Sequence, residues 1–272
     1  MPFATLDGQP LHYLDQGQGP VVFLAGSYLW DTSMWAPQIE ALSAQYRVIA
    51  VDLWGHGQSG PLPQGTASLD DVARQMLALL DHLQIERVTL VGLSVGGMWG
   101  ARMALAAPQR IDGLVLMDTY LGAEPEPTRQ YYFSLFQQIE DSGLIAEPLL
   151  DIVVPIFFRP GIDRQSALFQ DFRSSLAALP TERLRASVIP MGRITFSRAD
   201  VLDQLQHLDG PNTLLLCGDQ DQPRPPAETI EMAERIGCPY QLVPEAGHIS
   251  SRENPEFVTR ALLDFLATRH SH

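Results

Sequence analysis

The sequence contains no lysine, because all 18 of its basic residues are arginine. Without lysine the chain cannot form a Walker-type phosphate loop, a Schiff base to pyridoxal phosphate or a serine–lysine catalytic dyad. The basic residues are also outnumbered by 32 acidic ones, which gives a formal net charge of -14. Nucleic acids and anionic lipids bind to positively charged surfaces, so the composition predicts neither as a partner.

Cysteine and long apolar runs are scarce as well. The two cysteines, Cys217 and Cys238, are too few for a disulfide framework or a zinc site. No apolar stretch reaches the ~18 residues that a membrane-spanning helix needs. The first residues, from Met1 to Thr5, lack the charged start and apolar run of a secretory signal. We therefore expect a cytoplasmic protein.

What the sequence does contain is a series of short apolar runs that alternate with amphipathic stretches. This alternation predicts parallel strands joined by helices, and runs that are apolar on both faces suit a sheet covered on both sides. The strand-like runs lie at residues 21–24, 47–51, 87–91, 114–117, 213–216 and 240–243. Between them, from about residue 122 to 209, helix-like pieces interrupted by proline replace the strands. The sequence thus predicts an α/β core made of residues 1–122 and 210–272, with a helical cap inserted at residues 123–209.

A G-x-S-x-G motif, from Gly92 to Gly96, lies between one of these apolar runs and a helix-like stretch. A serine on so sharp a turn needs small neighbours, because the backbone approaches itself on both sides. Such a turn exposes the hydroxyl above the sheet, beside the free N–H groups of the helix N-terminus. We predict that Ser94 is a nucleophile and that the Val95 N–H is one oxyanion donor.

This motif, continued to Ala107-Pro108 and through the run from Gly113 to Asp118, resembles the α/β-hydrolase superfamily. Within it, the chain is most similar to the branch of 3-oxoadipate enol-lactonases and small carboxylesterases. The resemblance covers almost the whole chain. It implies an α/β-hydrolase fold and a serine hydrolase that cleaves a small carboxylic ester or lactone, with no metal or organic cofactor.

A serine hydroxyl needs a base to take its proton, and that base needs an acid to orient it. His248 lies in a glycine-containing loop between a predicted strand and the last helix, where the superfamily carries its catalytic histidine. The acid should follow the first strand after the insertion, where both Asp219 and Asp221 lie. The Gly-x-x-Asp pattern of similar proteins favours Asp221. Asp118, at the end of another strand, is a third candidate.

A second oxyanion donor should come from the loop after residue 24. Similar proteins have His-Gly-x in this loop and use the N–H of x, which is Ser27 here. Ala25 replaces the usual histidine, so the support of this loop differs from the family pattern. We predict that the Ser27 N–H is the second donor.

The cap should close over the site and shape an apolar pocket. The residues that we expect to line it are Tyr28, Trp30, Trp54, Phe133, Phe136, Phe157, Phe158 and Met191. Three arginines of the cap, Arg129, Arg159 and Arg193, are either solvated or available to pair with a substrate carboxylate, as an enol-lactonase would require.

Residues 55–60 form a second glycine motif, G-x-G-x-x-G, which also occurs in dinucleotide-binding proteins. That function requires a helix to start within the loop, whereas a proline-rich stretch follows here, so we predict a structural loop. Other functions stay open on the same scaffold. They are carbon–carbon bond hydrolysis, perhydrolysis, hydroxynitrile lyase chemistry, and ligand binding without catalysis. The sequence leaves the oligomeric state open.

Overall fold

A computed structural model describes residues 2–269, and a single eight-stranded sheet forms its centre. The strands follow the order β1-β2-β4-β3-β5-β6-β7-β8. The pairs β1/β2 and β2/β4 are antiparallel, and all the other pairs are parallel. The strands are β1 (Phe3–Leu6), β2 (Gln9–Gln16), β3 (Val21–Ala25), β4 (Arg47–Val51), β5 (Val88–Leu93), β6 (Ile111–Met117), β7 (Thr213–Gly218) and β8 (Tyr240–Val243).

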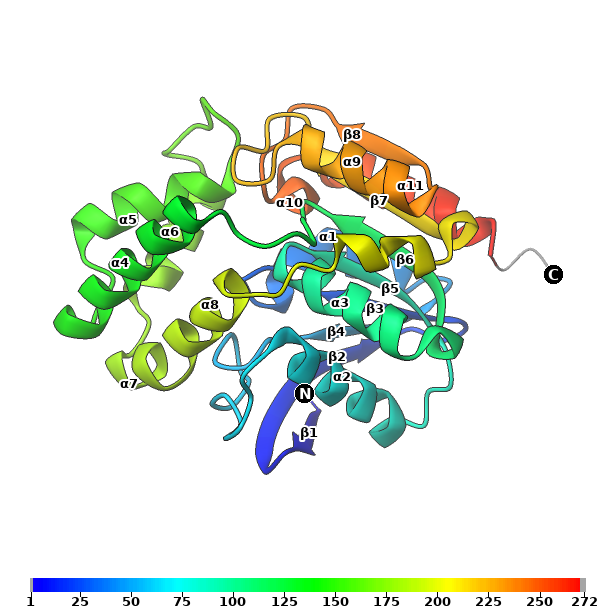
Figure 1. The fold of residues 1–272 in the computed structure, drawn as a ribbon, viewed down its shortest axis with the longest axis horizontal. Helices are drawn as coiled ribbons and strands as arrows, with labels where there is room; N and C mark the ends of the chain where they lie inside the picture. The colour runs from blue at the N-terminus through cyan, green and yellow to red at the C-terminus, as the bar shows by residue number, and fades with distance from the viewer. Residues whose placement is uncertain (1, 270–272) are drawn as a thin grey trace.

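Helices cover both faces of this sheet (Figure 1). Helices α2 and α3 pack together with α9 beside them on one face, and α1 packs against α11 on the other. The helices of this core are α1 (Ala36–Leu42), α2 (Leu69–His82), α3 (Val95–Ala106), α9 (Pro226–Ile236), α10 (Ser250–Glu253) and α11 (Pro255–Ala267). The predicted α/β-hydrolase architecture is confirmed.

Local sequence signals explain where these elements begin. The Ser68 side chain accepts a hydrogen bond from the Asp71 N–H, and the Asp71 side chain accepts one from the Ser68 N–H, so the two residues form a capping box at the start of α2. The central strands β5 and β7 are buried along their whole length, as expected for parallel strands between two helical layers. Their parallel register brings the carboxyl ends of β5, β6 and β7 to one edge of the sheet.

The segment between β6 and β7 forms a helical lobe at residues 126–196, to one side of the sheet (Figure 1, green to yellow-green). It contains α4 (Glu126–Ser142), α5 (Glu147–Val153), η3 (Val154–Phe157), α6 (Ala167–Ala177), α7 (Thr181–Arg183), η4 (Leu184–Val188) and α8 (Ile189–Phe196). The predicted insertion extends further, to residue 209. The difference arises because the short helix η5 (Leu202–His207) packs against α9 of the core.

The loop from Asp52 to Gly60 is held together by its own buried carboxylate. Asp52 accepts hydrogen bonds from the N–H groups of Thr32 (2.7 Å) and Gln58 (2.9 Å), and it pairs with His12 Nδ1 (2.7 Å). The Ser59 hydroxyl donates to the Asp52 carbonyl oxygen at 2.7 Å. This network explains the G-x-G-x-x-G spacing as a structural loop, in agreement with the prediction.

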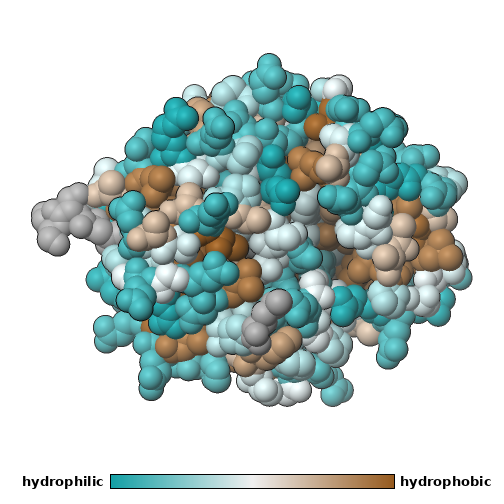
Figure 2. Space-filling model, turned by 180° about the vertical axis from the view of Figure 1, so that it is seen from behind, coloured by the Kyte–Doolittle hydropathy of each residue, from teal (hydrophilic) through white to brown (hydrophobic). Residues whose placement is uncertain are grey.

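The surface is mostly hydrophilic on the face that Figure 2 shows. On the face turned away from Figure 1, hydrophilic residues predominate, and hydrophobic ones gather in separate patches, some of them over the helical lobe (Figure 2). Leu144 and Ile152 are among the exposed large hydrophobic residues of that lobe, at 48% and 41% exposure. Within residues 2–269, every helix is too short or too polar to cross a bilayer.

Candidate active site

Ser94 lies on a sharp turn between β5 and α3, with φ +55° and ψ -119°. This backbone conformation is strained for a residue with a side chain, and such strain is typical of functional sites. The turn is possible because of its glycines. A Cβ atom on Gly92 would lie 2.5 Å from the Gly96 carbonyl oxygen, and one on Gly96 would lie 2.2 Å from the Ala25 carbonyl oxygen. The hydroxyl of Ser94 is thereby placed at the N-terminus of α3.

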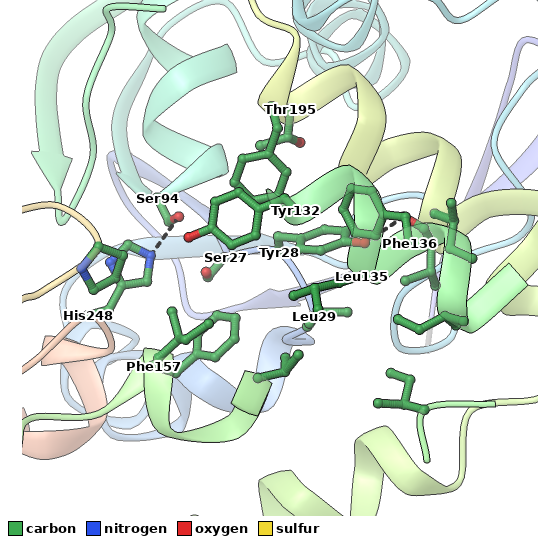
Figure 3. Close-up of a pocket in the computed structure, with 18 of the residues that line it drawn as sticks. Ser27, Tyr28, Leu29, Ser94, Tyr132, Leu135, Phe136, Phe157, Thr195 and His248 are labelled. Carbon is green, nitrogen blue, oxygen red and sulfur yellow. Dashed lines mark hydrogen bonds between the residues drawn. The ribbon is translucent and has the colours of Figure 1, made fainter. Parts of the chain in front are cut away.

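Three predicted residues from distant segments converge at this turn. The His248 Nε2 atom lies 2.9 Å from the Ser94 Oγ atom, and its Nδ1 atom lies 2.9 Å from Asp221 Oδ2 (Figure 3 shows the first of these bonds). All three side chains are buried, with 8%, 5% and 3% exposure for Ser94, His248 and Asp221. The Arg224 N–H donates to the second Asp221 oxygen at 3.0 Å, which fixes the carboxylate. This geometry allows the imidazole to take a proton from the hydroxyl.

The other two candidate acids have structural partners. Asp219 accepts a hydrogen bond from the Ala246 N–H at 3.3 Å and so supports the loop that carries His248. Asp118 accepts one from the Gly218 N–H at 2.7 Å and another from the Ser250 hydroxyl, which ties β6 to β7. Burial and the nearby charge of Asp221 raise the pKa of Asp118 well above its usual range. Both oxygens of Asp118 are thus engaged by Gly218 and Ser250.

Asp118, Cys217 and Asp221 also form a compact buried group, with one oxygen or sulfur atom of each within 4.8 Å of the others. Each of the three already has hydrogen-bond partners in the protein. The Cys217 thiol lies 3.3 Å and 3.4 Å from the carbonyl oxygens of Gly218 and Arg224, Asp118 accepts from the Gly218 N–H, and Asp221 contacts the Arg224 N–H and His248. The cluster therefore has the contacts of a hydrogen-bonded core group.

The two predicted oxyanion donors differ in their surroundings. Val95 is the first residue of α3, where N–H groups have no acceptor within the helix, so its N–H is available as predicted. The Ser27 N–H, in contrast, already donates to the Sδ atom of Met34 at 3.2 Å. Met34 is fully buried, so the Ser27 N–H has an acceptor within the protein, and its role as an oxyanion donor stays a prediction.

Ser94 and His248 open into an apolar cavity of about 90 Å³ between the core and the helical lobe. One stripe of α4 forms much of its wall, with Tyr132, Leu135 and Phe136 pointing into the cavity (Figure 3). The Tyr132 ring stacks on Phe196 with centroids 4.2 Å apart, and its hydroxyl points toward Ser94 and His248. Burial raises the pKa of Tyr132, so the phenol is neutral.

Three of the eight predicted lining residues, namely Tyr28, Phe136 and Phe157, do line the cavity. The other five do not. Trp30 is covered by Phe172, on which it stacks with centroids 4.1 Å apart. Trp54 lies in the core, where its indole N–H donates to Gln75 at 2.8 Å.

The other three predicted lining residues that do not line the cavity lie in the helical lobe. Phe158 packs with its edge against Trp30 and is 3% exposed, Met191 is fully buried, and Phe133 packs under the guanidinium of Arg193. None of the three lines the cavity. The lining residues that sequence reasoning missed include Tyr132, Leu135 and Phe196.

The three arginines considered for a substrate carboxylate are paired elsewhere. Arg129 pairs with Glu126, Arg159 with Glu253 at 3.2 Å, and Arg193 with Glu140 at 2.7 Å. None of the three lines the cavity among the described residues. The missed arginine is Arg224, which lines the cavity wall.

The charge of Arg224 is balanced within a buried cluster. Its guanidinium donates to both oxygens of Glu124, at 2.7 Å and 2.9 Å, and Arg198 donates to the same carboxylate at 2.9 Å. Glu228 lies 3.5 Å from Arg224 on the other side. The cluster joins both ends of the helical lobe to the loop that carries Asp221, because Glu124 precedes the lobe and Arg198 follows it.

This cluster predicts a pH-dependent contribution to stability. Burial raises the pKa of Glu228 from 4.5 to about 7, in spite of Arg224 nearby. Between these two values the unfolded chain releases a proton that the folded protein retains, so the contribution of Glu228 to stability is lost as the pH rises. In thermal unfolding, we expect Glu228→Gln to match the wild type near pH 4.5 and to gain stability relative to it up to about pH 7. If the difference in stability between Glu228→Gln and the wild type stays constant between pH 4.5 and 7, the raised pKa of Glu228 is contradicted.

Known proteins are similar to this chain in sequence and in fold. The alpha/beta hydrolase fold family matches residues 19–142. The 3-oxoadipate enol-lactonase 2 of Acinetobacter baylyi is 30% identical over 261 residues, which cover 95% of this chain and 93% of the relative. The chain belongs to the α/β-hydrolase family. It is a hydrolase.

Solved structures of other members of this family superpose closely on the hydrolase. A thermophilic esterase from Thermogutta terrifontis has a TM-score of 0.88 at 28% identity, covering 99% of this chain and all of the other. The enol-lactonase from Burkholderia xenovorans has a TM-score of 0.86 at 28% identity, covering 98% of this chain and all of the other. The likeness extends over the helical lobe as well as the core.

Proposed function

We propose that the hydrolase cleaves small, uncharged carboxylic esters or lactones through an acyl-enzyme on Ser94. The observation that carries this proposal is the continuous chain of two 2.9 Å contacts from Ser94 through His248 to Asp221, at the mouth of an apolar cavity. The names of the similar enol-lactonases and esterases support cleavage of an ester or lactone bond.

The reaction follows from the geometry. His248, oriented by Asp221, takes the Ser94 proton as the serine oxygen attacks the substrate carbonyl carbon. The carbonyl oxygen becomes an oxyanion that the Val95 N–H stabilises. When the bond to the alcohol breaks, His248 protonates the leaving oxygen. The same imidazole then activates a water molecule that releases the acid from Ser94.

The cavity wall favours an uncharged substrate. Most of the lining is aliphatic or aromatic, and Arg224 is the only arginine on it among the described residues. Both oxygens of Glu124 accept hydrogen bonds from that guanidinium. A substrate carboxylate would have to compete with Glu124 for Arg224, so we propose that neutral acyl groups bind better than anionic ones.

The size of the cavity predicts a preference for short acyl chains. A cavity of about 90 Å³ leaves little room for a long alkyl chain. We expect kcat/KM for p-nitrophenyl esters to be highest near the butyrate and to fall at least about tenfold for the decanoate, because each misfitting methylene costs about 1–3 kcal/mol of transition-state binding.

A matched pair of variants tests whether this cavity binds the acyl chain. Phe136 lines the cavity, whereas Phe133, one turn earlier on α4, does not. Phe136→Leu should shift the preference toward longer chains, with about a tenfold gain in the ratio of hexanoate to butyrate kcat/KM. Phe133→Leu should leave the ratio unchanged. Equal shifts in both variants would contradict the assignment of the cavity.

One comparison of substrates distinguishes ester hydrolysis from carbon–carbon bond hydrolysis and from binding without catalysis. Purified wild type is assayed with p-nitrophenyl butyrate and with a panel of carbon–carbon bond substrates, and labelling by a fluorophosphonate is measured alongside. Ester turnover with labelling supports the proposal. Turnover of the carbon–carbon substrates alone, or the absence of any labelling, would overturn it.

A further inference from the structure

The Ser27 side chain is a buried polar group that the steps above do not use. Ser27 is 1% exposed, and its hydroxyl oxygen has no hydrogen-bond partner within the described part of the chain. The residue lines the cavity together with Ser94 and His248, and Figure 3 shows its hydroxyl at the cavity wall beside them. A buried hydroxyl without a partner is costly and rare in folded proteins, and it requires an explanation.

The backbone N–H of Ser27, unlike the hydroxyl, has a hydrogen-bond acceptor within the protein. Its N–H donates to Met34 Sδ at 3.2 Å, and Met34 is fully buried beneath the loop. The sulfur also lies close under Gly26, where a Cβ atom would approach it to 2.9 Å. The contact with Met34 therefore supports a loop in which Ala25 replaces the usual histidine. As a consequence, the N–H is directed toward the sulfur and the hydroxyl faces the cavity.

We propose that Ser27 stabilises the oxyanion with its side-chain hydroxyl instead of its N–H, so that the oxyanion hole consists of one hydroxyl and the Val95 N–H. This inference rests on the proposed function. As the Ser94 oxygen forms its bond to the carbonyl carbon, the electron pair of the carbonyl double bond moves to the oxygen. The Ser94 proton passes to His248 Nε2. Ser27 donates a hydrogen bond to the new oxyanion and keeps its own proton throughout.

A pair of substitutions separates the two donors of Ser27. Ser27→Ala removes the hydroxyl and leaves the backbone N–H in place. We expect kcat for p-nitrophenyl butyrate to fall about a hundredfold or more, as for the loss of one oxyanion donor, with little change in KM. Ser27→Thr retains a hydroxyl and should stay within about tenfold of the wild type. A Ser27→Ala enzyme within threefold of the wild type, roughly 0.6 kcal/mol of barrier, would overturn the proposal.

A transition-state analogue distinguishes this role from a purely structural one. A trifluoromethyl ketone forms a tetrahedral oxyanion on the nucleophilic serine, so it requires the same donors as the reaction. In Ser27→Ala, its inhibition constant should rise by the same factor as kcat/KM falls. A large loss of kcat/KM with unchanged inhibition would show that the substitution acts through the fold, and it would overturn the proposal.

Met34 provides the reciprocal test. Met34→Leu removes the sulfur acceptor with little change in volume, so it frees the Ser27 N–H at small cost to the fold. If the hydroxyl is the donor, freeing the N–H gives no gain in kcat. A gain of about tenfold or more would identify the N–H as the donor and overturn the proposal. A wild type that neither hydrolyses esters nor reacts with a fluorophosphonate would overturn the proposed function itself, and the role of Ser27 with it.

Discussion

Replacing Ser94 with alanine is expected to reduce kcat for p-nitrophenyl butyrate by about a million-fold, to the level of residual binding and oxyanion stabilisation. The physical reason is that His248 Nε2, 2.9 Å from the Ser94 Oγ atom, would have no proton to take and no nucleophile to activate. Labelling by a fluorophosphonate should disappear in parallel. Both effects are measured on the purified variant against the wild type.

The substitution is small enough to leave the fold intact, which circular dichroism and the unfolding temperature can verify. Ser94 has a positive φ, which is strained for serine and alanine alike, so little change in stability is expected. Labelling that persists in Ser94→Ala would place the reactive nucleophile elsewhere. Ester hydrolysis at the wild-type rate would exclude Ser94 from the reaction.

Replacing Asp221 with asparagine is expected to lower kcat by about ten-thousandfold, because asparagine cannot hold the imidazole in the tautomer that accepts the serine proton. The carboxylate lies 2.9 Å from His248 Nδ1 and is buried, so solvent cannot substitute for it. KM should change little, since Asp221 is absent from the cavity wall among the described residues.

Asp118 offers a matched control for this experiment. It is also a buried aspartate at the end of a strand, and one of its carboxyl oxygens lies within 4.8 Å of a carboxyl oxygen of Asp221. Asp118→Asn keeps the shape of the side chain and an oxygen that can accept from the Gly218 N–H, and the hydrogen bonds of Asp118 involve Gly218 and Ser250, not His248. We expect this variant to retain kcat within about tenfold. Equal losses in Asp118→Asn and Asp221→Asn would contradict the assignment of the acid.

The fold could be predicted from the sequence because its signals are local and repeated. Each central strand is an apolar run of four to seven residues, and burial on both faces leaves few other structures for such a run. The turn at Ser94 is marked by a short motif, in which Gly92 is required by the backbone of Gly96 and Gly97 and Gly96 by the close approach of Ala25 from the neighbouring strand. The position of His248 followed from the resemblance to the family.

The cavity could be predicted only in part, because its wall depends on how the helical lobe packs against the core. The prediction of lining residues relied on aromatic residues in the cap and in the loops near the site. Trp30 and Phe158 are instead buried against each other and against Phe172. A signal for the wall did exist. Tyr132, Leu135, Phe136 and Ile139 recur at helical spacing on α4, and all four line the cavity.

The orientation of the Ser27 backbone has no signal in the sequence. Its N–H contacts Met34, seven residues later, and a sulfur acceptor leaves no recognisable motif. The pairing of Arg224 with Glu124 is even less accessible, because 100 residues separate the two. Contacts of this kind follow from tertiary packing and were found only in the structure.

The central claim is that an acyl group is transferred to Ser94, and mass spectrometry tests it most directly. The wild type is mixed with p-nitrophenyl butyrate, quenched in acid within the first turnovers, and examined as intact protein and as peptides. The account predicts a mass increase of one butyryl group, located on the peptide that contains Ser94. Rapid ester turnover with no such adduct, or with the adduct on a different residue, would contradict it.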